Sequence, residues 1–174
     1  MKHSIFIASI FVIAACNNAP APAENQQAAQ PEVHESPGTH EEMPAANDTT
    51  AILPGQKVYF KNLKEGQEIK LPYIVKFGVE GMEVEPAAGI VANKGHHHLV
   101  IDGVPVQANT MVPMGKETEG YYHFGKGQLQ DTLSLGKYPM LTPGNHSITL
   151  QFANGMHMSY GPAMSSTVHI VIKK

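Results

Sequence analysis

The sequence predicts an all-β domain, an immunoglobulin-like antiparallel β-sandwich of about seven strands, over residues 51–174. Several short segments alternate apolar and polar side chains, which is the period of a half-buried strand. Turn dipeptides such as Pro-Gly and Asn-Gly separate these segments, and none keeps a helical period for three turns. A domain of roughly 120 residues can bury an adequate core without disulfides.

The expected strands follow one another from the start of this domain. The second of them shows the alternation best, since Tyr73, Val75, Phe77 and Val79 interleave with more polar neighbours. A run from Gly95 to Asp102 is apolar enough to be a buried strand despite its three histidines. The strand pattern is present at residues 58–60, 73–80, 95–102, 132–135, 147–152 and 167–172.

The three consecutive histidines of the buried run are the most informative feature for function. Successive side chains of a strand point to opposite faces, so His96 and His98 share one face while His97 lies on the other with Leu99 and Ile101. Two imidazoles with this spacing can chelate one metal ion, and we take all three histidines as candidate ligands. The alternative is structural, with His97 in the core and the other two capping backbone groups.

Two further motifs carry histidine in unusual surroundings. His123 begins a glycine-rich stretch, His-Phe-Gly-Lys-Gly-Gln, in which the backbone can approach other groups closely. His157 stands between Met156 and Met158. Imidazole binds both copper states and thioether favours Cu(I), so this segment predicts copper ligands. Methionines that only fill the core are the alternative.

The residue types that the sequence lacks exclude some classes of function. The domain has no cysteine, which excludes disulfides and thiolate metal sites, and the chain has no arginine, which argues against nucleic acid as a partner. Only Asp102 and Asp131 supply aspartate in the domain, so we do not expect an enzyme. Asp102 is predicted to share the face of His96 and His98 and to orient an imidazole.

The N-terminal part predicts export and lipid attachment. Residues 1–15 have a short positive start and an apolar stretch too short to span a bilayer permanently, as in a signal peptide. Ile13-Ala14-Ala15-Cys16 resembles the lipobox of bacterial lipoproteins, which implies acyl chains such as palmitate on Cys16 and an outer-membrane location. Residues 16–50, rich in proline and polar side chains, predict a disordered linker between this anchor and the domain.

Several of these motifs resemble one bacterial family. Gly-His-His-His-Leu-Val-Ile-Asp at 95–102, His-Phe-Gly-Lys-Gly-Gln at 123–128 and Pro-Gly-Asn-His-Ser-Ile-Thr-Leu at 143–150 are similar to motifs of the domain of unknown function 4399. The resemblance implies a secreted protein or lipoprotein of the cell envelope and leaves its activity open. The segment from Val104 to Tyr122 departs from the family pattern and predicts a loop.

Three hypotheses of function remain open at this point. The first is an envelope lipoprotein that binds a transition metal, with copper favoured, and stores, buffers or transfers it. The second is a non-enzymatic, immunoglobulin-like interaction module whose histidines are structural and whose partner is another envelope protein or a glycan. The third is a metalloenzyme with an open coordination position. The first predicts that His96 or His98, His123 and His157 meet at one end of the sandwich, whereas structural histidines would scatter.

The lipobox generates a direct test. Cys16→Ser should release the protein from the membrane fraction, because the acyl anchor is lost while the domain still folds. Fractionation of cells that produce the parent or the variant measures this. A variant that remains firmly membrane-bound would show that the lipobox interpretation is wrong.

Overall fold

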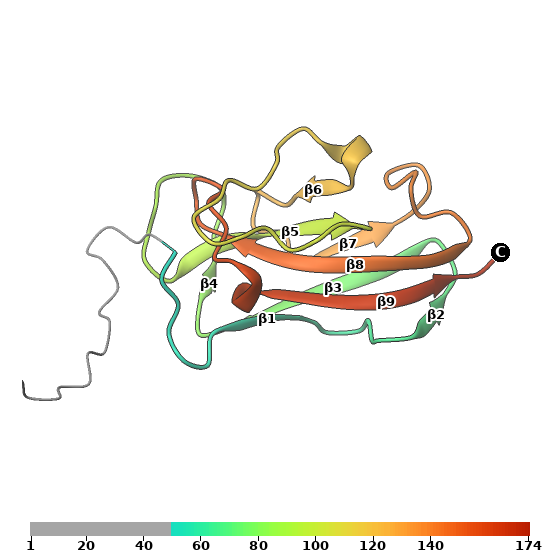
Figure 1. The fold of residues 1–174 in the computed structure, drawn as a ribbon, viewed down its shortest axis with the longest axis horizontal. Helices are drawn as coiled ribbons and strands as arrows, with labels where there is room; N and C mark the ends of the chain where they lie inside the picture. The colour runs from blue at the N-terminus through green and yellow to red at the C-terminus, as the bar shows by residue number, and fades with distance from the viewer. Residues whose placement is uncertain (1–49) are drawn as a thin grey trace, which may run out of the picture. The chain divides into compact units, whose positions relative to one another are not determined.

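The computed structural model describes residues 50–174, which form two β-sheets with two short 3-10 helices. One sheet has the strand order β1-β3-β7, and the other has the order β2-β9-β8-β5-β4, with β6 also paired to β5 (Figure 1). The strands are β1 (Lys57–Phe60), β2 (Gln67–Ile69), β3 (Tyr73–Glu80), β4 (Glu83–Val84), β5 (Lys94–Ile101), β6 (Tyr121–His123), β7 (Gln130–Leu133), β8 (Gly144–Ala153) and β9 (Ser165–Ile172), and the helices are η1 (Glu117–Glu119) and η2 (Pro162–Met164).

The predicted all-β sandwich is confirmed, and all six expected strands are present. The strand count is nine within residues 50–174, because β2, β4 and β6 are only two or three residues long and too short to show an alternation. The sheets are also not purely antiparallel. Both β2 on β9 and β4 on β5 are parallel pairs at sheet edges.

One hydrophobic core lies between the two sheets. On β5, Leu99 and Ile101 point inward and are completely buried, as are Leu150 and Phe152 of the neighbouring strand β8. Phe77 of β3 packs against them from the other sheet. Burying such large apolar side chains supplies most of the stabilisation, at roughly 25 cal/mol for each Å² removed from water.

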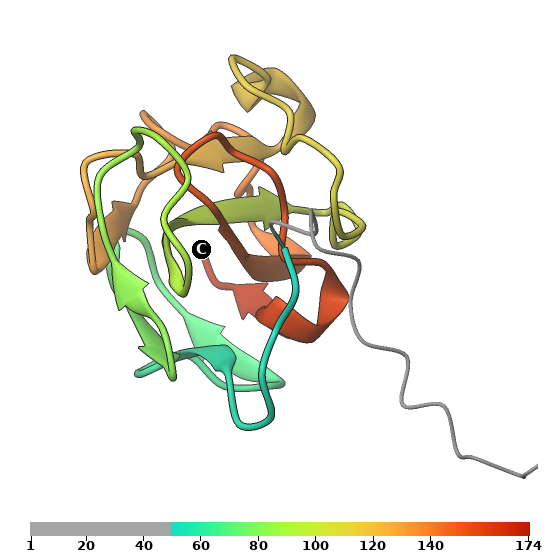
Figure 2. The same ribbon diagram turned by 90° about the vertical axis from the view of Figure 1, so that its left-hand side faces the viewer.

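The outer face of the six-stranded sheet is covered as well. The segment 103–120 runs along this sheet and is yellow in Figures 1 and 2. The Val106 amide donates a hydrogen bond to the Gln151 side chain (2.8 Å), and the Ser159 hydroxyl donates to the Val106 carbonyl (2.9 Å). The predicted loop, residues 103–120, therefore packs on the outer face of the six-stranded sheet; it contains η1 and leads into β6. Because of it, β5 is buried on both faces.

The predicted signal peptide, Cys16 and the linker up to residue 49 lie outside the described residues. Within residues 50–174, no helix is long and apolar enough to cross a membrane.

Because both faces of β5 are buried, shortening a large side chain of this strand should destabilise the domain strongly. Leu99→Ala should lower the free energy of unfolding by about 2–5 kcal/mol, because it leaves a cavity in a site that has no exposed surface. Leu135→Ala is the matched control, since that leucine is 52% exposed and should cost little. Urea unfolding of both variants measures the difference, and similar losses would contradict this account of the core.

Candidate metal centre

Two histidines of the candidate site come from the outer face of β5. His96 and His98 lie two residues apart, so the pleat places both rings on the side opposite the core. The antiparallel register sets His123, at the end of β6, directly opposite His98. Three imidazoles are thus brought together by strand pairing alone.

The fourth imidazole, His157, is presented by a tight turn after β8. The His157 amide donates to the Asn154 carbonyl (2.9 Å), and His157 has a φ of 65°. This is the left-handed position of a turn with a bulge, which glycine usually occupies. Asn154 is completely buried, and its Oδ1 accepts the amides of Met156 (3.0 Å) and Met158 (3.1 Å). Asn154 therefore holds the backbone that aims His157 at the sheet.

The four rings form one cluster. Their centroids are between 4.8 Å and 5.9 Å apart, whichever pair is taken. The Nε2 atom of His123 lies 3.2 Å from Nε2 of His96 and also 3.2 Å from Nε2 of His157. One ligand nitrogen from each of His96, His98 and His123 lies within 4.8 Å of the others, a spacing that could hold a metal ion.

Hydrogen bonding alone does not satisfy this cluster. A neutral ring nitrogen carries either one hydrogen or one lone pair, so Nε2 of His123 cannot bond well to both of its neighbours. Within residues 50–174, Nδ1 of His96 and both ring nitrogens of His98 are buried without a hydrogen-bond partner. Ligands about 2.0–2.1 Å from a tetrahedral ion are about 3.3 Å apart, close to the observed separations.

Burial favours the neutral form of His96, His98 and His123. Burial, and then the neighbouring ring of His123, lowers the pKa of His96 to about 3. Burial also lowers the pKa of His98 well below its usual value and, with the nearby His157, lowers that of His123. Neutral imidazole is the metal-binding form, so protons do not compete for these nitrogens at neutral pH.

Glycines allow the loops to pack closely around the rings. A Cβ at Gly125 would lie 2.1 Å from Cε1 of His123, so only glycine fits beneath that ring. A Cβ at Gly155, in the turn before His157, would lie 2.2 Å from the carbonyl oxygen of Gly89. The Ala87 amide also donates to the Gly125 carbonyl (2.8 Å), which joins the 86–92 loop to the site.

Two predicted site residues lie elsewhere. His97 packs against Phe77 and Phe152 in the core, on the opposite face from the cluster, and burial lowers its pKa to about 4. The His97 ring is therefore not placed to bind a metal ion together with the clustered histidines. Asp102 follows β5 with a φ of 53°, which turns it away from the strand face. Its carboxylate accepts Nδ1–H of His146 (2.8 Å), so it orients an imidazole outside the cluster.

The two predicted methionine ligands are not buried with the histidines. Met156 is 51% exposed on the turn. Met158 is adjacent to Ser159, which pairs with Ala153, and Ala153 in turn pairs with His96. Since neighbouring residues of a strand point to opposite faces, Met158 is directed away from the face of His96.

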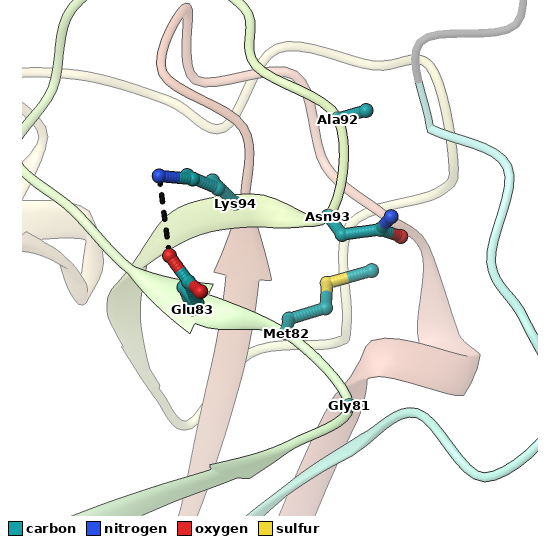
Figure 3. Close-up of a pocket in the computed structure, with 6 residues that line it drawn as sticks. All are labelled: Gly81, Met82, Glu83, Ala92, Asn93 and Lys94. Atoms are coloured by element: carbon teal, nitrogen blue, oxygen red, sulfur yellow. Dashed lines mark ion pairs between the residues drawn. The ribbon is translucent and has the colours of Figure 1, made fainter.

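Two hollows on the described surface are separate from this cluster. One, shown in Figure 3, lies beside β4 and is lined by Met82 and Asn93, with an ion pair between Lys94 and Glu83 (3.1 Å). Its charges therefore neutralise each other. Another contains His146, whose ring nitrogens are both already engaged, with Asp102 and with the Thr142 carbonyl.

Sequence reasoning missed the residues that shape the site without joining it. Asn154 had a signal only as part of an Asn-Gly turn, and its two side-chain hydrogen bonds depend on how that turn closes. Gly125 was recognised as permitting close approach, but the group that approaches it is the ring of His123. No local signal indicates that His157 has a left-handed backbone.

The lowered pKa values predict acid sensitivity of the metal-free protein. The unfolded chain binds protons on these imidazoles near pH 6.5, whereas the folded chain binds them only near its lower pKa values, about 3 for His96. The contribution of the neutral histidines to the free energy of unfolding should be fully present above about pH 6.5 and should be lost as the pH falls toward 3. Urea unfolding at several pH values measures this, and His96→Gln should show a shallower decrease. Equal pH dependence in both proteins would contradict it.

Comparison with known proteins gives the family. No curated protein and no solved structure matches the chain significantly. The model of the family described as domain of unknown function DUF4399 matches residues 75–173. This match spans more than half of the chain, from within β3 to the end of β9, and includes all four clustered histidines. The chain therefore belongs to the DUF4399 family.

Proposed function

We propose that this protein is a non-enzymatic lipoprotein of the bacterial cell envelope that binds one transition metal ion, with copper favoured. Its role is to store, buffer or hand over the ion. His96, His98, His123 and His157 are the proposed ligands.

One observation carries the proposal: Nε2 of His123 lies 3.2 Å from two other ring nitrogens, and no arrangement of protons satisfies all three. A buried polar group without a partner costs about 1–3 kcal/mol. The His98 ring has two such nitrogens and His96 has one. A bound ion would use the free lone pairs and offset that cost.

The ligand set supports copper over other ions. Calcium and magnesium prefer oxygen ligands, and the cluster contains only imidazoles. Among divalent first-row ions, copper binds nitrogen sites most tightly. The rings of His123 and His157 are half-buried while those of His96 and His98 are buried, so an ion would reach the centre from the loop side.

The proposed location follows from the lipobox at Cys16. Acyl chains on that residue would anchor the protein in the outer membrane, and the linker would carry the domain away from the bilayer. The family gives the domain no activity, so storage or transfer rests on the site itself.

Metal titration of the purified chain, without an affinity tag, tests the proposal. The parent should bind about one copper ion per chain and melt at a higher temperature with the metal, because the ion binds only the folded state. Combining His98→Ala with His157→Ala should abolish this binding. Competition with zinc reports selectivity.

Two matched variants control for folding. His157→Gly removes one ligand ring while it relieves the left-handed backbone, so melting of the metal-free protein should not suffer, yet affinity should fall by more than about tenfold. His169→Ala removes a histidine that is exposed and paired with Glu65, and it should bind copper like the parent. Equal affinity in the parent and His157→Gly, or no binding by the parent at micromolar copper, would overturn the proposal.

A further inference from the structure

A group of methionines lies beside the histidine centre on the opposite side of the same turn. Met111 forms an antiparallel bridge with Met158. The flanking hydrogen bonds run from the Val112 amide to the His157 carbonyl and from the Ser159 amide to the Thr110 carbonyl, both 2.9 Å. This is the non-hydrogen-bonded type of pair, in which Cα atoms are about 4.5 Å apart and the side chains are closest.

Met156 belongs to the same group. Its amide and that of Met158 both donate to Oδ1 of Asn154, so the two backbones are held as near neighbours. Met111 is 56% exposed and Met156 is 51% exposed, while Met158 is half-buried. In contrast, Met82 and Met164 are buried in the core, as apolar side chains normally are.

The thioether groups of these methionines are suited to a soft cation. Thioether sulfur is an uncharged soft ligand that selects Cu(I) and related monovalent ions over zinc, calcium or magnesium. Met111 is paired with Met158, and Met156 is two residues away on the same turn, so these flexible side chains are near enough along the backbone to converge on one ion. They cannot be protonated, so acid would not release an ion from them.

We propose that Met111, Met156 and Met158 form a second metal site, which takes a soft monovalent cation of the Cu(I) class and is separate from the histidine centre. The turn at residues 154–158 connects the two sites, because it carries His157, whose ring joins the histidine cluster, between Met156 and Met158. A role in capturing ions for the histidines rests on the proposed function above, but the thioether site itself does not.

Silver(I), a stable monovalent probe for Cu(I), tests this with the full chain labelled at its methionine methyl groups. Substoichiometric Ag(I) should shift the NMR signals of Met111, Met156 and Met158 and leave those of Met82 and Met164 in place. The triple variant Met111→Leu, Met156→Leu and Met158→Leu should bind one Ag(I) fewer per chain than the parent. Met140→Leu, a half-buried methionine that packs on the core, should bind as the parent does.

The histidine variants separate the two proposals. In the protein with His98→Ala and His157→Ala, the thioether site should still bind Ag(I), and the methionine signals should still shift. If those shifts vanish, the methionines are part of the histidine centre and no second site exists. Unchanged Ag(I) stoichiometry in the triple leucine variant would also overturn the thioether site. Copper binding by the histidines can be measured in the same triple leucine variant. Its result tests the histidine centre and does not depend on whether the thioether site exists.

Discussion

The pleat of β5 requires its successive side chains to point to opposite faces of the six-stranded sheet. Since both faces are buried, every residue from Gly95 to Ile101 is enclosed by protein. Leu99 and Ile101 point into the core from one face, and His96 and His98 point from the other face toward the rings of His123 and His157. The strand therefore combines a packing role with the proposed binding role, and its position between β8 and β6 fixes where the other histidines can join it.

Burial of histidine on this outer face has two linked effects. Loss of water lowers the pKa of His96 and His98, which keeps their lone pairs free. The same loss of water leaves ring nitrogens without hydrogen-bond partners, a cost that the folded protein must offset elsewhere. Such a site is preorganised, because the rings are held in place before any ion arrives. Both ring nitrogens of His97 also lack a hydrogen-bond partner among the described residues, but that ring packs alone between Phe77 and Phe152. The convergence of four rings, together with this cost, is therefore the physical reason to regard the cluster as functional.

The loops around the cluster carry the conformations that a regular strand could not supply. His157 has a backbone conformation that favours glycine, and Asn154 stabilises the turn because its Oδ1 accepts the amides of Met156 and Met158. Gly125 and Gly155 let a ring and a neighbouring loop approach to distances that any Cβ would prevent. The His157 amide and carbonyl are both hydrogen-bonded, to Asn154 and Val112, so the turn holds this left-handed residue in place and its ring stays directed at the cluster.

The sequence by itself determined the fold class, the principal strands and the face on which each histidine of β5 lies, because these follow from a period of two along a single segment. It also indicated His123 and His157 as partners of that face. Only the tertiary structure decided that His97 is a core residue, that Asp102 serves His146, and that Met158 is directed away from the cluster. These facts depend on strand register, on a left-handed residue and on a covering segment, and each of them is set by contacts between residues far apart in the chain. Local pattern does not contain that information, since a side chain's neighbours across a sheet are chosen by the packing of the whole domain.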